Sequence, residues 1–155
     1  MPVFELRAAV ATDAPGVTAC VCEAYVHYIE RIGKQPGPML EDYVEVIDQC
    51  FVRVALAEGK VVGAIVMKLT EEGFYIDNVA VRPAVKAQGV GRKLLEFAEA
   101  EARSRGYTSI YLATHELMAE NRSLYGRIGY VEYDRRQVSG YSRVFLRKSL
   151  SQGGG

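Results

Sequence analysis

Residues 85–92 read VKAQGVGR, with Gly89 and Gly91 one residue apart, basic side chains on both sides and no acid among them. Residues 74–81 have the composition of a strand, and residues 90–105 have helical spacing. A strand that leads through a glycine loop into a helix presents unpaired backbone N–H groups at the positive end of the helix. Glycine also lets a ligand approach the backbone closely. The stretch therefore predicts a site for phosphate oxygens, such as a pyrophosphate.

Two common nucleotide-binding motifs do not fit this stretch. Walker A requires G-K-S/T, and the dinucleotide fingerprint requires Gly or Ala three residues after Gly91, where Leu94 stands. An isolated glycine pair is also compatible with a tight turn whose charged side chains are solvated. The charge pattern favours an anion site, because no acid accompanies the cations of this segment. These cations are Arg82, Lys86, Arg92 and Lys93.

Composition fits a single globular domain. The chain has 155 residues, of which 49% are apolar and 25% charged, and we expect one domain over residues 1–150 with a disordered tail, residues 151–155. The 19 basic side chains are balanced by 19 acidic ones, which argues against nucleic acid or an anionic membrane as partner. No apolar run approaches the ~20 residues of a membrane span. The chain start does not resemble a secretory signal, so we expect a cytoplasmic protein.

The three cysteines are Cys20, Cys22 and Cys50. The spacing of the first two is not the C-x-x-C of redox or zinc sites, and no further Cys or His lies at a suitable distance. We therefore expect thiols that pack in the fold, and no metal site.

Hydrophobic periodicity predicts the element order β-α-α-β-β-β-α-β-α-β-β. The first helix is expected over residues 12–31, capped by Thr12-Asp13, and the second over residues 39–49. Gly106 is placed to cap the helix that ends near residue 105. The other elements are expected at residues 4–8, 51–57, 61–69, 74–81, 90–105, 107–113, 119–128, 130–137 and 141–147.

Residues 78–95, NVAVRPAVKAQGVGRKLL, resemble the acetyl-CoA signature Q/R-x-x-G-x-G/A of the GNAT N-acetyltransferases. Lys86 stands where the signature has Gln or Arg, which keeps a donor but loses the planar fork of Arg. A second segment, ENRSLYGRIGY at residues 120–130, is similar to the family's E-N-x-x-L-Y-x-x-x-G-[FY]. The resemblance implies the family's α/β fold, a mixed and mostly antiparallel sheet with splayed parallel strands at the coenzyme site.

The resemblance also implies direct transfer of an acetyl group from acetyl-CoA to an amine. The amine must be neutral, the carbonyl oxygen must be stabilised as it becomes negative, and the departing sulfur needs a proton. In the family, the splayed strand leaves backbone groups for the acetyl and pantetheine arm, which implies the Val79 N–H as donor to the carbonyl oxygen. The residues implied for coenzyme binding are Val79, Ala80, Val81, Lys86, Ala87, Gln88, Gly89, Val90, Gly91, Arg92, Lys93, Asn121 and Tyr125.

Tyr125 matches the family's general acid. A phenol with a reference pKa of ~10 stays protonated at pH 7 and can give its proton to a thiolate. The pattern alone would also allow a ring that only packs at the end of a helix. Asn121 lies one turn earlier on the same face and is implied to bind the pantetheine amides, whereas alone it would indicate an N-cap.

The general base is left open by the sequence. Asp77 shares strand parity with Val79 and Val81, which makes its carboxylate a catalytic candidate, acting directly or through water. Tyr75 shares that face, and His115, expected just past the next strand, has an ordinary pKa suited to proton transfer. A chain of water molecules is the alternative.

The acceptor is expected to bind between the first two helices, their connection and the closing hairpin, because these overhang the coenzyme strands in the family. The candidate contacts are Tyr25, His27, Tyr28, Met39, Tyr75, His115 and Tyr141. Tyrosines at helical spacing are also typical of a core. We expect a small-molecule amine as acceptor, with a protein or peptide acceptor, or a regulatory CoA-binding domain without turnover, as alternatives. A homodimer is left open.

Overall fold

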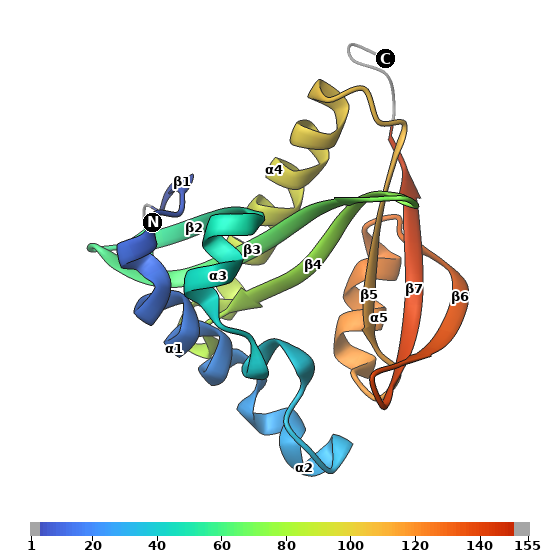
Figure 1. The fold of residues 1–155 in the computed structure, drawn as a ribbon, viewed down its shortest axis with the longest axis horizontal. Coiled ribbons are helices and arrows are strands. Elements are labelled where there is room, and N and C mark those ends of the chain that lie inside the picture. Colours follow the sequence, from blue (N-terminus) through green and yellow to red (C-terminus); the bar gives the residue numbers. More distant parts are fainter. Residues whose placement is uncertain (1–3, 151–155) are drawn as a thin grey trace. The chain divides into compact units, whose positions relative to one another are not determined.

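A computed structural model of the chain describes residues 4–150, and the expected tail, residues 151–155, lies outside these. Within the described residues, seven strands form a sheet in the order β1-β2-β3-β4-β5-β7-β6 (Figure 1). The chain divides into two compact units, which we describe separately. One contains the residues up to Lys68 together with Asn78–Phe97, and the other contains Leu69–Asp77 and the residues from Ala98 onward.

The first unit begins with an antiparallel meander of β1 (Glu5–Ala8), β2 (Phe51–Ala57) and β3 (Lys60–Thr70). Glu58 and Gly59 form a two-residue turn with φ of 52° and 79°, which matches the twist of the strands it joins. The expected strand bounds left residues 58–60 for this turn. The observed turn is one residue shorter, since Lys60 already pairs with Ala57.

A β-bulge in β3 determines which side chains of this strand face α1 and which face α4. Leu56 pairs with Val61 but Ala55 pairs with Gly63, which inserts one extra residue into β3. The insertion reverses the alternation of side chains, so Val61 lies against α1 whereas Gly63 lies against α4. Figure 1 shows the two helices on opposite sides of these strands.

The helical part of the first unit is more broken than predicted. The expected helix over residues 12–31 is divided by 3-10 turns, and the second expected helix is two separate segments because Glu41 and Asp42 have extended backbones. Asp42 caps the later segment by accepting the N–H of Val44 at 3.0 Å. The segments are η1 (Ala11–Asp13), α1 (Ala14–Tyr25), η2 (Val26–Tyr28), α2 (Ile29–Ile32), η3 (Gly37–Leu40) and α3 (Tyr43–Gln49).

The predicted cap at Thr12-Asp13 is wrong in its chemistry. Asp13 precedes α1, but its carboxylate makes no cap hydrogen bond to that helix. It accepts instead from Arg7 Nη1 at 2.7 Å and Nη2 at 3.0 Å, and from the N–H of Val10 at 2.8 Å. The side chain therefore ties the helix start back to β1.

β4 (Gly73–Val81) contributes to both units and is followed by η4 (Pro83–Gln88) and α4 (Val90–Ser104). One face of α4 is buried, with Leu94, Leu95, Ala98 and Ala102 each at most 2% exposed. The predicted glycine cap is confirmed. Gly106 has a φ of 88°, and Tyr107 N–H donates to Ala102 O at 3.0 Å, as in a Schellman motif.

The second unit contains β5 (Ser109–His115), α5 (Ala119–Arg127), β6 (Val131–Val138) and β7 (Tyr141–Ser149). β5 pairs parallel with β4 from Phe74↔Ile110 to Ile76↔Leu112 and antiparallel with β7, so the sheet is mixed, as predicted. β5 begins two residues later than expected because Tyr107 belongs to the cap of α4. β5 also ends later than expected, and His115, expected beyond the strand, is its last residue.

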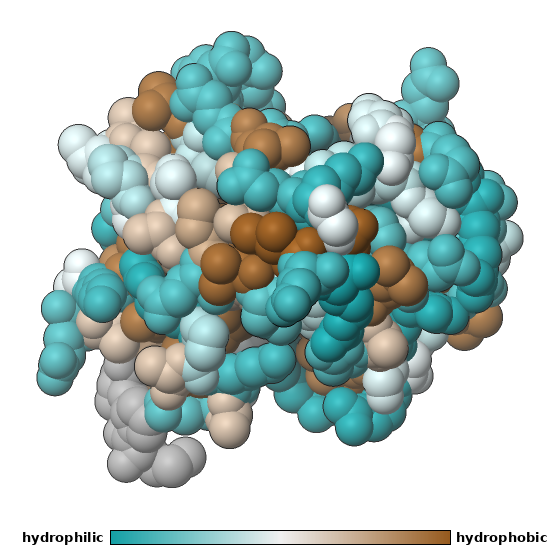
Figure 2. Space-filling view, turned by 90° about the horizontal axis from the view of Figure 1, so that it is seen from below, coloured by the Kyte–Doolittle hydropathy of each residue, from teal (hydrophilic) through white to brown (hydrophobic). Residues whose placement is uncertain are grey.

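Apolar side chains fill the interior, led by Phe74, Ile65 and Met67 among those that are fully buried. Figure 2 shows one face of the molecule, where hydrophilic residues cover most of the surface and a group of apolar residues lies near its centre.

Candidate active site

The junction between β4 and α4 has the backbone geometry of an anion site. Arg82 leaves β4 with its N–H bonded to Val62 O at 2.9 Å, and Gly89, with a φ of 82°, turns the chain from η4 into α4. Hydrogen bonding in the helix begins with Lys93 N–H to Gly89 O at 3.1 Å. The N–H groups of residues 90–92 precede that bond and therefore have no carbonyl partner within the helix. They lie at the positive end of a helix of 15 residues.

The two glycines of this junction have different reasons to be glycine. Gly89 adopts a left-handed φ, which strains any residue with a Cβ. Gly91 is helical, and a Cβ there would meet only Val81 Cγ2, at an ordinary contact distance of 3.4 Å. The fold thus demands Gly89, whereas it would tolerate a Cβ at Gly91. Val90 between them is 1% exposed, so its side chain packs inward and only its backbone faces the junction.

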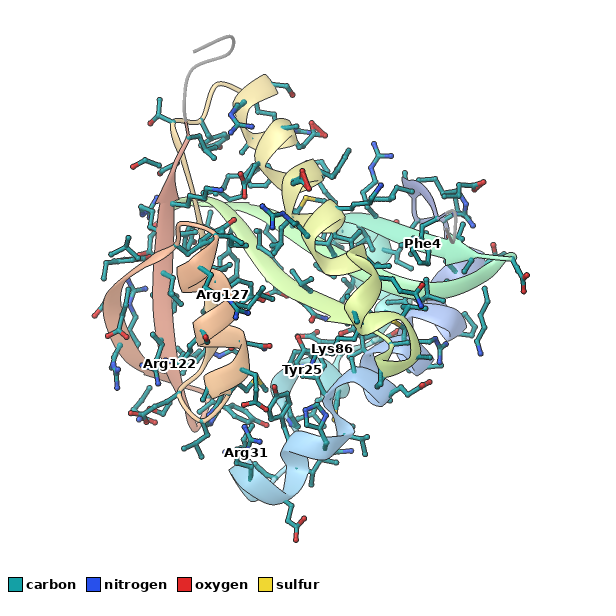
Figure 3. The ribbon with its side chains drawn as sticks, turned by 180° about the vertical axis from the view of Figure 1, so that it is seen from behind. Phe4, Tyr25, Arg31, Lys86, Arg122 and Arg127 are labelled. Carbon is teal, nitrogen blue, oxygen red and sulfur yellow. The ribbon has the colours of Figure 1, made fainter. Side chains whose placement is uncertain are left out.

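The expectation that four cations share this segment is wrong for one of them. Arg82 is 8% exposed, its Nη1 is paired with the Glu23 carboxylate, and its Nε donates to Val61 O at 2.7 Å. It therefore fastens β4 to the bulge of β3. Figure 3 shows Lys86 beside the start of α4. Three exposed cations without an ion pair in residues 4–150 remain for an anion: Lys86, Arg92 and Lys93.

The neighbouring coenzyme candidates differ in what they expose. Val79 and Val81 are half-buried, whereas Ala80 is 1% exposed on the opposite face of β4. Only the backbone of Ala80 is therefore suited to contact a ligand. Ala87 and Gln88 end η4 and are exposed.

Tyr125 lies near the C-terminal end of α5 and is 8% exposed. Its ring packs edge-on against Tyr130 with centroids 5.8 Å apart, and its carbonyl accepts the Tyr130 N–H at 2.9 Å. The chain thus folds back on the phenol and holds it in one place. Asn121 lies one turn earlier and donates from Nδ2 to Met118 Sδ at 3.6 Å. The helix N-cap is Met118, so the cap alternative for Asn121 does not apply.

Among the candidate bases, Asp77 follows the three residues of β4 that are registered with β5, and it is half-buried. Tyr75, on the same face, stacks on Tyr111 with centroids 4.7 Å apart. Burial, and then the charge of Asp77, raise the pKa of Tyr75 well above its ordinary value. Tyr75 is therefore a neutral phenol that can donate a hydrogen bond, and it is unsuited to accept a proton.

His115 is held by the turn that follows β5. Its Nδ1 accepts the N–H of Leu117 at 3.0 Å, and its ring lies edge-on to Tyr141 at 6.1 Å. A neutral imidazole that accepts at Nδ1 carries its proton on Nε2. In this arrangement the Nε2–H of His115 is a hydrogen-bond donor, which suits it to bind an oxygen atom of the acceptor substrate. Tyr141, beside it, is 9% exposed.

The acceptor candidates of the first unit do not share one environment. Tyr25 and Tyr28 are 7% and 2% exposed, whereas His27 is exposed and packs on the Tyr28 ring at 4.0 Å. Met39 is half-buried in η3, with its N–H bonded to Pro36 O at 3.0 Å. The Tyr25 hydroxyl lies 2.9 Å from both Asn78 Oδ1 and Val79 O, so it is engaged with β4.

Sequence reasoning missed two residues beside this hydroxyl. Asn78 is 6% exposed and donates from Nδ2 to the Tyr43 hydroxyl at 3.0 Å; Tyr43 is 3% exposed. Asn78 belongs to the quoted coenzyme signature, and an amide in an otherwise apolar strand was a signal, because a buried amide needs hydrogen-bond partners. Its partners could not be read from spacing, since they lie 53 and 35 residues away.

Comparison with known proteins agrees with this geometry. The family model described as "Acetyltransferase (GNAT) family" matches residues 21–130. The chain belongs to the GNAT acetyltransferase family. It is an acetyl-CoA-dependent acetyltransferase.

Three relatives of this GNAT acetyltransferase are informative. The aminoalkylphosphonate N-acetyltransferase of Salmonella typhimurium is 30% identical over 139 residues, 84% of this chain and 86% of the relative. The PaiA N-acetyltransferase of Thermoplasma acidophilum, in complex with coenzyme A, is similar with a TM-score of 0.77 at 16% identity, covering 95% of this chain and 99% of that one. The ribosomal-protein-S18-alanine N-acetyltransferase of Escherichia coli is similar with a TM-score of 0.76 at 18% identity, covering 98% and 97%. At such identities the two structures show the fold alone.

The junction residues of this GNAT acetyltransferase fit acetyl-CoA. First-turn N–H groups, a residue without a side chain at position 91 and three exposed cations are what a pyrophosphate requires. No group of three His, Cys, Asp or Glu side chains suited to a metal occurs within residues 4–150. Nor does any helix in that range have the length and apolar character needed to cross a bilayer.

Proposed function

We propose that this GNAT acetyltransferase transfers the acetyl group of acetyl-CoA to the primary amine of a small molecule. The observation that carries the proposal is the 30% identity, along most of both chains, with an enzyme named for its aminoalkylphosphonate acceptor. A single acetyltransferase domain over residues 1–150 is part of the proposal, because the family match at residues 21–130 includes residues of both compact units.

The backbone of residues 89–92 and the side chains of Lys86, Arg92 and Lys93 hold the phosphates of the coenzyme. Lys86 contributes a point charge where the family signature has a planar or amide donor, so its contact depends on charge more than on shape. When bound, acetyl-CoA supplies the acetyl group, and its sulfur leaves as a thiolate. Backbone groups of Val79, Ala80 and Val81 hold the pantetheine arm, with the Val79 N–H directed to the acetyl oxygen.

Tyr125 is the general acid in this proposal. Its phenol holds a proton at Oη at neutral pH and donates it to the departing sulfur. The packing of its ring against Tyr130 supports this role, because a proton donor must be held in one orientation. Asn121, one turn earlier, offers its amide to the pantetheine arm.

Asp77 removes the proton of the amine, directly or through water. Its half-buried carboxylate lies beside the neutral phenol of Tyr75, so the two groups offer one acceptor and one donor on the same strand face. The candidate contacts of the acceptor are Tyr75, His115, Tyr141, His27, Tyr28 and Met39.

The test is a panel of acceptors incubated with the full chain and acetyl-CoA, with released thiol and acetylated product both measured. The panel contains aminoalkylphosphonates, other primary amines and an alanine-ended peptide. We expect turnover with small amines, and aminoalkylphosphonates among the better acceptors. Turnover with the peptide alone would replace this proposal by a protein acetyltransferase. Tight CoA binding without any turnover would replace it by a regulatory domain.

A further inference from the structure

Three buried side chains of the first unit form a continuous hydrogen-bonded chain that joins β4 to the loop before α3. Tyr25, Asn78 and Tyr43 are 7%, 6% and 3% exposed. The Tyr25 hydroxyl lies 2.9 Å from both Val79 O and Asn78 Oδ1, Asn78 Nδ2 lies 3.0 Å from the Tyr43 hydroxyl, and that hydroxyl lies 2.7 Å from Pro38 O. We refer to these three side chains as the Tyr25–Asn78–Tyr43 chain.

The direction of each hydrogen bond follows from the two ends, because both are carbonyl oxygens that can only accept. Tyr43 must donate its single proton to Pro38 O, so its oxygen accepts from Asn78 Nδ2. The amide oxygen of Asn78 then faces Tyr25. The Tyr25 hydroxyl proton consequently lies between Asn78 Oδ1 and Val79 O.

The Val79 carbonyl lies on a particular edge of β4. Arg82 N–H bonds to Val62 O of β3, so the residues of β4 with the parity of Arg82 direct their backbone groups toward β3. Val79 has the other parity, and its N–H and C=O both point to the opposite edge. Tyr25 is therefore a side-chain partner for Val79 on the edge where the proposed donor to the acetyl oxygen is also found.

The other end of the chain lies in the segment expected to bind the acceptor. Pro38 belongs to η3 (Gly37–Leu40), which also contains Met39. The Tyr43 hydroxyl is bonded to this segment and to Asn78 at the same time. One buried amide thus couples the placement of η3 to the placement of the Asn78–Val79 peptide.

We propose that the Tyr25–Asn78–Tyr43 chain is a positioning device of this GNAT acetyltransferase, in which Tyr25 fixes the Val79 peptide for the acetyl group and Tyr43 fixes η3 for the amine. The inference rests on the proposed function, because it assigns the Val79 N–H to the acetyl oxygen and η3 to the acceptor. None of the three side chains touches the reacting atoms. Each acts through the backbone that it holds.

The test compares Tyr25→Phe and Tyr43→Phe, which each remove one oxygen and keep the ring. Tyr25→Phe is expected to lower kcat by about tenfold or more, because a small misplacement of a donor slows transfer, with KM for acetyl-CoA within about twofold. Tyr43→Phe is expected to raise KM for the amine by about tenfold with a smaller loss in kcat. The control is Tyr107→Phe, since Tyr107 packs against Phe74 at 5.8 Å and lies outside the proposed site.

A second readout uses the protein without coenzyme. Amide hydrogen exchange of the β4 segment that contains Val79 is expected to be faster in Tyr25→Phe than in Tyr107→Phe, because the Val79 carbonyl has lost its hydroxyl partner. Thermal unfolding of all variants is measured as well, and the assay temperature is set below every melting temperature so that each variant is folded.

One contrary result is turnover by the wild-type enzyme while both variants have a kcat and an amine KM within twofold of its values. That result would overturn this inference and leave the proposed function intact. Losses that follow melting temperature in all three variants would also overturn it, because a purely structural role predicts them. Absence of wild-type turnover with any amine would overturn the proposed function and this inference with it.

Discussion

Gly63 in β3 lies directly beneath Val90, the first residue of α4: a Cβ on Gly63 would lie 2.8 Å from Val90 Cγ1 and 3.2 Å from Leu94 Cδ1. Val90 is itself 1% exposed, so its side chain is enclosed by the core. The closeness of these two residues sets the height of the helix start above the sheet. The first-turn N–H groups of α4, which we propose to bind the coenzyme, therefore depend for their position on a glycine that lies outside the signature.

Gly63→Ala tests this dependence. We expect the start of α4 to be displaced, at a cost of about 1–3 kcal/mol in the free energy of unfolding, because the added methyl overpacks a filled core. CoA affinity is expected to fall as well, since the first-turn N–H groups move with the helix. Calorimetric CoA titration and urea unfolding measure both effects. Normal CoA affinity in a folded Gly63→Ala protein would show that coenzyme binding does not depend on the position that Gly63 gives to the start of α4.

Gly91→Ala separates ligand space from folding. The structure accommodates a Cβ at Gly91, and replacing glycine by alanine in a helix stabilises it by up to ~1 kcal/mol. The melting temperature is therefore expected to stay equal or rise, while the affinity for CoA falls by at least about tenfold because the methyl occupies the phosphate's place. Gly89 does not serve this purpose, since its left-handed φ makes any substitution strained. Unchanged CoA affinity in Gly91→Ala would refute the proposal that the backbone of residues 89–92 binds the phosphates.

Elements with local signals were predictable from the sequence, and their ends often were not. Strand-type runs between turn residues identified most strands, and Gly106 identified the end of α4 because a left-handed cap favours glycine. The breaks in the expected helix over residues 12–31 were missed, because its apolar spacing continues through η2. Asp13 was misread as a cap because its partner, Arg7, lies in β1, six residues earlier in the chain.

The candidate site was predictable to the extent that it is written in consecutive residues. Residues 86–93 form the expected strand–glycine–helix junction, since glycine and helix signals act locally. Arg82 was misjudged because its charge is cancelled by Glu23, 59 residues earlier in the chain. Asn78 was overlooked for the same reason, because its partners come from α1 and α3.

Asp13 should make stability depend on pH. Hydrogen bonds from Arg7 hold the pKa of Asp13 below its ordinary value. A lowered folded-state pKa adds stability above the unfolded-state value of ~3.9, and this contribution is lost as the pH falls through the folded-state pKa. Asp13→Asn should therefore lower the free energy of unfolding by about 1–2 kcal/mol at pH 7.

Urea unfolding of Asp13→Asn and wild type at pH 7 and at about pH 3 measures this difference, which should shrink at the lower pH. Asp48→Asn, at an exposed position in α3, is the matched control. A difference of equal size at both pH values would show that the ionised carboxylate is not the source.

The cysteines should take no part in transfer. Burial raises the pKa of Cys20 from 9.0 to about 11, which leaves roughly 100-fold less thiolate at pH 8 than an ordinary thiol has. We expect a maleimide to label Cys22 and Cys50, which are partly exposed, well before Cys20. Cys20→Ala should retain wild-type kcat. A trapped acetyl-cysteine would contradict this expectation.

Tyr125→Phe tests the central claim, direct transfer with Tyr125 as the proton donor, most directly. The change removes one oxygen and keeps the ring that packs against Tyr130. With an accepted amine in excess, we predict a fall in kcat of about 10²–10⁴-fold, the usual loss when a positioned general acid is removed, with a similar KM for acetyl-CoA. A Tyr125→Phe enzyme that retains more than about a third of wild-type kcat, far short of that loss, would show that water or another group protonates the sulfur.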